Sequence, residues 1–369
     1  MQHDLRFVIS GGGTGGHIFP AIAIANALKR KTKAEILFVG AKGRMEMEKV
    51  PMAGYEIKAL PIAGIQRKLD VKNLLLPFKV LKSLQMAKKI LRDFQPDAVV
   101  GVGGYASGPV LYAAAQMKIP TLIQEQNSFA GITNKILGKR VNKICVAFGG
   151  MEKFFPEKKI VLTGNPVRND MANGNRNEAL KFFELKKGVP TLLIIGGSLG
   201  ARTINDSVLS GIEKIYNAGI QVIWQTGQNY FDKIQLEPKF KERIKIFPFI
   251  QRMDWAYASA DIVISRAGAI AVSELCLVGK PAILVPSPNV AEDHQTRNAL
   301  SMVKNNGAIL VKDDEAREKL IDAAIALMQD ENRKSVLSAN IGKMAFANAD
   351  EKIADEILDL VKRNSSHAN

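Results

Sequence analysis

Residues 10–17 read SGGGTGGH, and this stretch decides which fold the rest of the chain can adopt. It follows the apolar run Leu5–Ile9 and precedes apolar residues at helical spacing in 18–28, so it predicts a strand, a glycine loop and the start of a helix. Glycine at five of the six positions 11–16 lets the backbone turn tightly and approach a ligand. Because the first N–H groups of a helix attract anions, the stretch predicts a phosphate-binding loop beside the imidazole of His17.

Other interpretations of this loop stay open at this point. Residues 11–16 also satisfy G-x-G-x-x-G, a weak dinucleotide fingerprint, and a purely structural glycine turn would look the same. A nicotinamide dinucleotide is disfavoured because its ribose needs an acidic side chain at the end of the second strand. The predicted second strand, 36–39, is followed by Gly40, Ala41 and Lys42, while Glu35 precedes it at the wrong end.

The composition predicts two domains and an acidic partner. At 369 residues the chain exceeds one domain of about 150 residues, and its apolar share of 47% can fill two cores. A formal net charge of +15 indicates nucleic acid, an anionic lipid surface or a phosphorylated substrate as partner. No apolar run approaches the ~20 residues that span a bilayer, and no signal peptide is recognisable, so we expect the chain to stay in the cytoplasm. Cys145 and Cys276 lie in apolar segments and predict buried thiols.

Strands and helices alternate twice along the chain, which is typical of parallel α/β sheets. The first half predicts strands over 36–39, 55–60, 98–102 and 121–124, with helices over 69–94, 110–117 and 133–138. The second half predicts strands over 191–195, 221–225, 245–249, 261–265 and 281–285, with a helix from Asn205. The loops pair across the two halves: GGGTGGH with GGSLGAR, GVGGYASG with SRAGAIAVSE, and LIQEQN with ILVPSP.

We therefore expect an α/β protein of two tandem Rossmann-like domains, 1–165 and 166–345, whose ligand-binding edges face each other across a cleft. The boundary falls near 163–169, where Gly164, Asn165 and Pro166 interrupt regular structure. Residues 346–369 predict a C-terminal helix that packs back on one domain, the N-terminal one being the first candidate.

Taken together and in order, the motifs resemble the MurG family of peptidoglycan glycosyltransferases. They are GGGTGGH, EQN followed by AG and TNK, GNPVR, GGSLGAR, SRAGAIAVSE and DHQTRNA, and they span Phe7 to Ala299. The resemblance implies the GT-B fold and an inverting transfer of N-acetylglucosamine. The donor would be UDP-N-acetylglucosamine, and the acceptor the C4 hydroxyl of the N-acetylmuramyl moiety of lipid I, giving lipid II. The first domain would face the acceptor and the membrane, and the second would bind the UDP-sugar.

Such a transfer needs a base for the acceptor hydroxyl and stabilisation of the departing diphosphate. His17 is the candidate catalytic base, because an imidazole at a helix N-terminus is disfavoured in its charged form. A histidine that only caps the helix or orders the loop is the alternative. No Asp-x-Asp pair occurs in the sequence, so we expect no metal and no cofactor, and helix N-termini would stabilise the diphosphate instead. Ser198 in GGSLGAR is the candidate diphosphate contact, unless that loop is a simple turn.

The resemblance also implies a set of donor contacts. A carboxylate such as Glu274 can accept from both ribose hydroxyls, and amides such as Asn127 and Gln295 suit neutral sugar groups. Ile250 would read uracil through its backbone, and Arg168 would meet the diphosphate. Without the resemblance, the sequence would predict Glu274 and Arg168 to be ordinary surface residues. The whole implied donor set is Thr14, Gly15, Gly16, Asn127, Arg168, Ser198, Ile250, Ala269, Ile270, Ala271, Val272, Ser273, Glu274 and Gln295.

The chain departs from the family pattern at three positions of these motifs. Many members carry glutamine at the position of Leu199, serine at that of Ala267, and a second glutamine at that of His294. These departures put side-chain contacts at the three positions in doubt but leave backbone contacts unaffected. His294 is a poor rival to His17 as base, because no glycine loop adjoins it.

Part of the positive net charge is concentrated in one basic segment. Residues 65–92 hold eight Lys or Arg and one acidic residue, Asp70, interleaved with apolar side chains. Such a helix can lie on an anionic membrane, which would place the protein peripherally at the cytoplasmic face of the cell membrane. The predicted patch is Lys72, Leu75, Leu76, Phe78, Lys79 and Lys82. An ordinary amphipathic helix with its apolar face in the core is the alternative.

Two rival functions remain. A UDP-sugar epimerase or hydrolase on the same two-domain fold would need no membrane acceptor, so release of UDP that depends on a lipid-linked acceptor discriminates against it. A non-catalytic nucleotide- or nucleic-acid-binding protein would fit the charge, but no nucleic-acid module is recognisable, and we expect no nucleic-acid partner.

Overall fold

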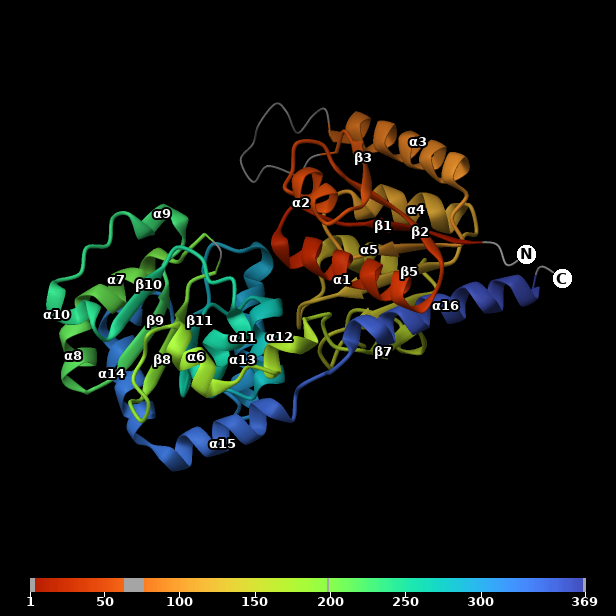
Figure 1. Cartoon of the computed structure of the whole chain (residues 1–369). Helices are drawn as coiled ribbons and strands as arrows, with labels where there is room; N and C mark the ends of the chain where they lie inside the picture. The colour runs from red at the N-terminus through yellow and green to blue at the C-terminus, as the bar shows by residue number, and fades with distance from the viewer. Residues whose placement is uncertain (1–3, 63–75, 198, 368–369) are drawn as a thin grey trace. The chain divides into compact units, whose positions relative to one another are not determined.

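The computed structural model describes residues 4–62, 76–197 and 199–367, shown in Figure 1. The chain divides into two compact units, which are described separately below. The first unit comprises Met1–Val167 and Asn348–Asn369, and the second comprises Arg168–Ala347. The described residues contain no helix that is both long and apolar enough to cross a membrane.

The first unit is built on a seven-stranded, parallel sheet with the order β3-β2-β1-β4-β5-β6-β7. Its chain runs outward from β1 to one edge and then returns to β4, so β1 and β4 are neighbours whose following loops diverge. This is the switch point at which open α/β sheets bind ligands. The strands are β1 (Leu5–Ser10), β2 (Ala34–Ala41), β3 (Glu56–Leu60), β4 (Ala98–Gly101), β5 (Thr121–Glu125), β6 (Lys143–Val146) and β7 (Ile160–Leu162).

Successive side chains of these strands point to opposite faces of the sheet and pack into two separate cores. Phe7 and Ile9 pack with helix α1, whereas Val8 between them packs with α3 and α4 on the other face. Both faces are apolar because helices cover both, as parallel sheets require. The helices of this unit are α1 (Gly15–Lys31), α2 (Glu46–Met52), α3 (Leu76–Phe94), α4 (Ser107–Gln116), α5 (Ile132–Gly138) and α16 (Ala349–His367).

Helix α16 brings the end of the chain back to the first unit, where it lies beside α1 (Figure 1). Ile353 and Ile357 are fully buried in the core formed by α1 and the sheet. Ion pairs fix its register: Arg30 lies 2.6 Å from Asp350, and Lys143 lies 2.7 Å from Glu356. One face of the first sheet therefore depends on residues far apart in the sequence.

The second unit repeats the plan with a six-stranded, parallel sheet in the order β10-β9-β8-β11-β12-β13. Counted from its own first strand, the order matches that of the first unit, so β8 and β11 form the second switch point. The strands are β8 (Thr191–Ile195), β9 (Gln221–Gln225), β10 (Ile244–Phe247), β11 (Ile262–Ser265), β12 (Ala282–Leu284) and β13 (Ile309–Leu310).

The helices of the second unit again lie on both faces of the sheet. Helices α7 and α14 share a core with one face, and α11 packs against β8 on the other. The helices are α6 (Arg176–Phe182), α7 (Arg202–Ser210), α8 (Ile212–Asn217), α9 (Gln228–Phe231), α10 (Pro238–Lys241), α11 (Met253–Ser259), α12 (Ala269–Val278), α13 (His294–Lys304), α14 (Ala316–Gln329) and α15 (Glu331–Gly342), with the 3₁₀ turns η3 (Asn169–Ala172) and η4 (Ala291–Asp293).

The two-fold repeat predicted from the sequence is confirmed. Each pair of matched loops follows the first, fourth or fifth strand of its own sheet, and β8 and β9 have the predicted bounds. Strands β6, β7 and β13, of four, three and two residues, were not predicted. Helix α7 begins at Arg202, three residues before the predicted start, and the predicted helix segment 69–75 lies outside the described residues.

The prediction of buried thiols is also confirmed. Cys145 and Cys276 are free and buried, and burial raises the pKa of each thiol to about 12. Both are therefore inert thiols at neutral pH, since the reactive form is the thiolate.

Truncating Ile357 to Ala should destabilise the first unit by about 2–5 kcal/mol, because the cavity lies in a closed core. Lys352→Ala, on the exposed side of the same helix, is the matched control and should change little. Hydrogen exchange distinguishes the units: amides of β1 and β4 should exchange faster in the Ile357 variant, while those of β8 and β11 should not. Equal acceleration in both sheets would contradict a separate core closed by α16.

Candidate functional site

The two glycine loops of the first unit touch each other at the β1/β4 switch point. A Cβ added to Gly11 would lie 2.1 Å from Cγ2 of Val102, and one added to Gly104 would lie 2.5 Å from the carbonyl oxygen of Gly12. Gly104 also has a φ of +84°, a left-handed conformation that favours glycine. Only glycine lets these loops approach so closely, so both present backbone at the carboxyl edge of the sheet.

A buried carboxylate that sequence reasoning missed holds the first loop in place. Glu46, 1% exposed, accepts hydrogen bonds from the backbone N–H of Gly13 at 2.8 Å and of Ala41 at 3.0 Å. A Cβ on Gly12 would lie 2.2 Å from this carboxylate, so the loop rests directly on it. Its position after the second strand was the only signal in the sequence.

His17 is the third residue of α1, after the N-cap Thr14. Its Nδ1 lies 3.1 Å from the carbonyl oxygen of Gly12 and 3.3 Å from Oγ1 of Thr14. A carbonyl only accepts, so Nδ1 carries the proton in this contact and Nε2 carries the lone pair of the neutral ring. A Cβ on Gly103 would lie 2.9 Å from Nε2, which places this nitrogen against the loop after β4. The partial positive charge at the start of the helix opposes protonation of the ring.

Asn127 follows β5, the next strand along the same edge, and a second buried carboxylate orients it. Glu125, 2% exposed, accepts from the backbone N–H of Asn127 at 3.1 Å. Its other oxygen accepts from the backbone N–H of Gly131 at 3.0 Å and from Nδ2 of Asn134 at 2.9 Å. The motif EQN…AG…TNK is therefore one hydrogen-bonded loop, of which sequence reasoning singled out only Asn127.

At the second switch point, Gln225 joins the loop after β8 to the end of β10. Its Nε2 donates to the carbonyl of Gly197 at 3.1 Å, and its Oε1 accepts from the N–H of Ile250 at 2.8 Å. Gly197 and Gly200 have φ values of +87° and +80°, which again favours glycine in this loop. Ser198, the predicted diphosphate contact, lies outside the described residues. Gln225 was not predicted, and the backbone N–H of Ile250 is already bonded within the chain.

Glu274 lies on α12, which follows β11, and it contacts one donor of α11. Oη of Tyr257 donates to Oε2 of Glu274 at 3.0 Å. Burial raises the pKa of Glu274 to about 7, while the Tyr257 hydroxyl and the charge of Arg168 act in the opposite direction. Burial, together with the charge of Glu274 and the hydrogen bond to it, raises the pKa of Tyr257 well above its ordinary value, so this phenol stays a donor.

The remaining predicted donor residues also lie in the second unit. Arg168, 58% exposed at its side chain, pairs with Asp170 at 3.5 Å, beside the turn η3 that packs on α11 and α12. Gln295, in the first turn of α13, accepts from the N–H of Ser287 at 2.9 Å. The predicted stretch Ala269–Ser273 forms the first half of α12. Glu292 and Asp293, directly before α13, both have a φ of +53°, which is strained for residues other than glycine.

The predicted residues thus form two sets. Thr14, Gly15, Gly16, His17 and Asn127 lie at the carboxyl edge of the first sheet. Ile250, Glu274, Gln295 and the loop after β8 lie at the carboxyl edge of the second. No three His, Cys, Asp or Glu side chains gather as a candidate metal site among residues 4–62, 76–197 and 199–367.

The described part of the predicted membrane patch is the beginning of α3. Phe78 is 72% exposed, Leu81 is also exposed, and Lys82 stands beside them, while Lys79 is half-buried. Ala87 and Leu91 of the same helix are buried in the core, so the helix has both an inward apolar face and exposed apolar residues. Lys72 and Leu75 lie outside the described residues, as do the side-chain contacts of Leu76.

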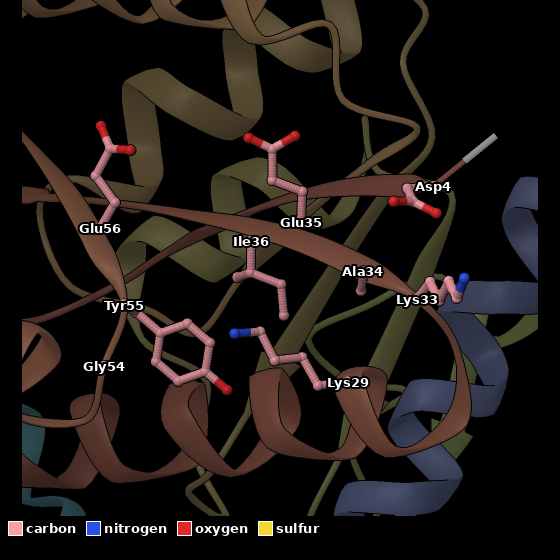
Figure 2. Close-up of a pocket in the computed structure, with 9 residues that line it drawn as sticks. All are labelled: Asp4, Lys29, Lys33, Ala34, Glu35, Ile36, Gly54, Tyr55 and Glu56. Atoms are coloured by element: carbon pink, nitrogen blue, oxygen red, sulfur yellow. The ribbon is translucent and has the colours of Figure 1, made fainter.

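A surface hollow lies at the opposite edge of the first sheet, at the amino ends of β1 and β2 (Figure 2). Lys29 stands 4.6 Å above the ring of Tyr55, and Lys33, Glu35 and Glu56 add charges of both signs. A hollow of mixed charge away from the glycine loops offers no focused anion site, so it does not extend the predicted site.

Comparison with known proteins agrees with this geometry. The glycosyltransferase family 28 N-terminal domain matches residues 7–146, and the family's C-terminal domain matches residues 191–357. Two similar proteins are each named UDP-N-acetylglucosamine–N-acetylmuramyl-(pentapeptide) pyrophosphoryl-undecaprenol N-acetylglucosamine transferase. The one from Phocaeicola vulgatus is 53% identical over 98% of both chains, and the one from Cytophaga hutchinsonii is 54% identical over 98% of both.

Solved structures give the same result for the fold. The crystal structure of Acinetobacter baumannii MurG is 28% identical, has a TM-score of 0.78, and covers 96% of this chain and 99% of its own. A UDP-GlcNAc 2-epimerase from Neisseria meningitidis, with UDP-GlcNAc bound, is 15% identical with a TM-score of 0.64 over 96% of this chain and 99% of its own, which shows a shared fold alone. The chain therefore belongs to the MurG family of glycosyltransferase family 28 and has the GT-B fold, as its ordered motifs predict.

Proposed function

We propose that this chain transfers N-acetylglucosamine from UDP-N-acetylglucosamine to the C4 hydroxyl of the N-acetylmuramyl moiety of lipid I, giving lipid II for peptidoglycan synthesis. The observation that carries the proposal is the setting of His17, whose Nδ1 lies 3.1 Å from the carbonyl oxygen of Gly12 at the β1/β4 switch point. The names of the relatives support the donor and the acceptor.

In the proposed reaction, Nε2 of His17 takes the proton of the acceptor hydroxyl. The hydroxyl oxygen then attacks C1 of the donor sugar from the side opposite the diphosphate. The bond between C1 and the diphosphate oxygen breaks, its electrons leave with UDP, and the configuration at C1 inverts. The N-terminus of α7 and Arg168 stabilise the charge on the leaving diphosphate without a metal.

The donor would be held by the edge of the second unit. The carboxylate of Glu274 accepts from the ribose hydroxyls, and the first half of α12, Ala269–Ser273, lies beside it. Because Gln225 occupies the N–H of Ile250, the carbonyl of Ile250 is the group we assign to the N–H of uracil. The amides of Asn127 and Gln295 bind the N-acetylglucosamine of the donor, together with Thr14, Gly15 and Gly16.

The acceptor carries a polyprenyl diphosphate, which would bring the enzyme to a membrane. The start of α3 exposes Phe78 and Leu81 next to lysines, and this composition suits an anionic lipid surface. We therefore place the protein peripherally at the cytoplasmic face of the cell membrane, with the first unit turned to the acceptor.

Replacing His17 by Ala should lower the rate of transfer of labelled N-acetylglucosamine to lipid I by about 10²–10⁴-fold, since the base is lost. Donor binding, measured by calorimetry with UDP-N-acetylglucosamine, should survive, and added imidazole should restore part of the rate. In the wild type, UDP release should require lipid I. Normal turnover of the His17→Ala variant would contradict the assignment of His17 as the base. UDP release by the wild type without lipid I would favour a hydrolase or an epimerase.

Reversing Lys72, Lys79 and Lys82 to Glu should weaken binding to anionic phospholipid vesicles by about a hundredfold, at ~1 kcal/mol for each lysine. Vesicle sedimentation at two salt concentrations measures this loss. The charge-matched control reverses Lys181, Lys187 and Lys304, which are exposed in the second unit. An equal loss in both triple variants would show that net charge alone binds the membrane, and no loss in either would refute the patch.

Transfer should proceed at an unchanged rate in excess EDTA, because helix N-termini and Arg168 are proposed to stabilise the leaving diphosphate. Initial rates with and without the chelator measure this directly. Activity that disappears with EDTA and returns with magnesium would contradict the metal-free mechanism.

A further inference from the structure

Tyr257 forms a side-chain pair with Glu274 inside the second unit, and the proposed reaction gives Tyr257 no role. Tyr257 is 1% exposed on α11, and its phenol donates to Oε2 of Glu274 on α12 at 3.0 Å. The helix α11 is itself fixed by packing on α6, β8 and η3. The phenol is therefore a rigid donor that holds one carboxylate oxygen in place.

The direction of this hydrogen bond is set by the environment of both groups. The pKa of Tyr257 lies well above its ordinary value, so the phenol keeps its proton at any working pH. The pKa of Glu274, at about 7, is raised by burial and lowered by Tyr257 and by Arg168 near η3. Near neutral pH the phenol and the guanidinium thus favour the ionised carboxylate, which can only accept.

An oriented carboxylate suits a pair of neighbouring hydroxyls. A carboxylate has about four acceptor positions, and the phenol of Tyr257 uses one of them. Two ribose hydroxyls can occupy two of the others when the rotation of the carboxylate is fixed. A ligand that lacks one hydroxyl leaves an acceptor unpaired, which is how such sites discriminate strongly between analogues.

We propose that Tyr257 is a positioning residue for the donor: its phenol fixes the Glu274 carboxylate as an acceptor for both ribose hydroxyls and so sets the preference for a ribonucleotide over a 2′-deoxyribonucleotide. The inference rests on the proposed role of Glu274 in binding the donor. It assigns a function to a buried tyrosine that makes no direct contact with the ligand.

The central test is Tyr257→Phe, which removes the hydroxyl and keeps the ring. Calorimetry with UDP and with 2′-deoxy-UDP measures the preference without requiring transfer. Affinity for UDP should fall about tenfold, in the range for a hydrogen bond to a charged group, and the preference over 2′-deoxy-UDP should fall towards one. In the transfer assay, KM for the donor should rise with kcat little changed.

The pH profile gives a readout that a merely structural role would not move. In the wild type, KM for the donor should rise as pH falls through about 7, because protonation of Glu274 removes an acceptor. Loss of the phenol raises the pKa of Glu274 further, so the midpoint should move to higher pH in Tyr257→Phe. Site-specific 3-fluorotyrosine at position 257, a stronger donor, should move the midpoint to lower pH and gives a second variant if the first does not fold.

Two controls separate the possible failures. Tyr216→Phe removes a hydroxyl from another ring of the same unit, packed on Phe240, and should leave every value unchanged. Glu274→Gln should abolish the preference for UDP over 2′-deoxy-UDP. Adding Tyr257→Phe to this variant should not change the preference further.

If Glu274→Gln keeps the preference, the donor role of Glu274 is wrong. A second outcome overturns only the role of Tyr257. In that outcome Glu274→Gln loses the preference for UDP over 2′-deoxy-UDP, while a folded Tyr257→Phe variant keeps the preference, the wild-type KM and the wild-type pH midpoint. A Tyr257→Phe variant that loses kcat with unchanged preference and pH profile would likewise overturn it, because the phenol would then act only on the structure.

Discussion

The order of the parallel strands is the constraint on which the rest of this structure depends. In each sheet the first and fourth strands are neighbours, so the loops that follow them must diverge from one point. Two loops that leave the same point compete for space, and side chains there would collide, as a Cβ on Gly11 would with Val102. Glycine resolves this conflict and leaves backbone N–H groups at the edge. The glycine-rich motifs are thus a consequence of strand order before they are a property of any ligand site.

Three carboxylates, of Glu46, Glu125 and Glu274, show how the same chemical group serves two purposes. Glu46 and Glu125 each accept from backbone N–H groups on both oxygens, and so they hold loops in place. Glu274 has one side-chain donor, Tyr257, within the described part of the chain. Its burial is therefore less fully compensated, which agrees with its raised pKa. A carboxylate that the fold leaves partly unsatisfied is the one suited to a ligand.

The sequence predicted the features that depend on local pattern. The strands β8 and β9, the paired glycine loops and the setting of His17 follow from apolar runs and glycine spacing, and they match the structure. Glu46 and Gln225 were missed because each has a hydrogen-bond partner far along the chain, Gly13 at 33 positions and Ile250 at 25, and nothing in the sequence names that partner. The hydrogen bond that occupies the N–H of Ile250 was missed for the same reason, because its acceptor is Gln225. Strand β13, with two residues, lacks the length to show a pattern.

The duplication also gives a reason for dividing the proposed chemistry between two units. A base must be neutral to take a proton, whereas a leaving diphosphate gathers negative charge, and a neighbouring anion favours protonation of an imidazole. A single loop that held both groups would therefore weaken its own base. In this chain the loop before α1 carries His17, while the matching loop before α7 reads GGSLGAR, without an imidazole. In the proposed reaction, the duplication thus allows the loop before α1 to keep a neutral base while the loop before α7 binds the diphosphate.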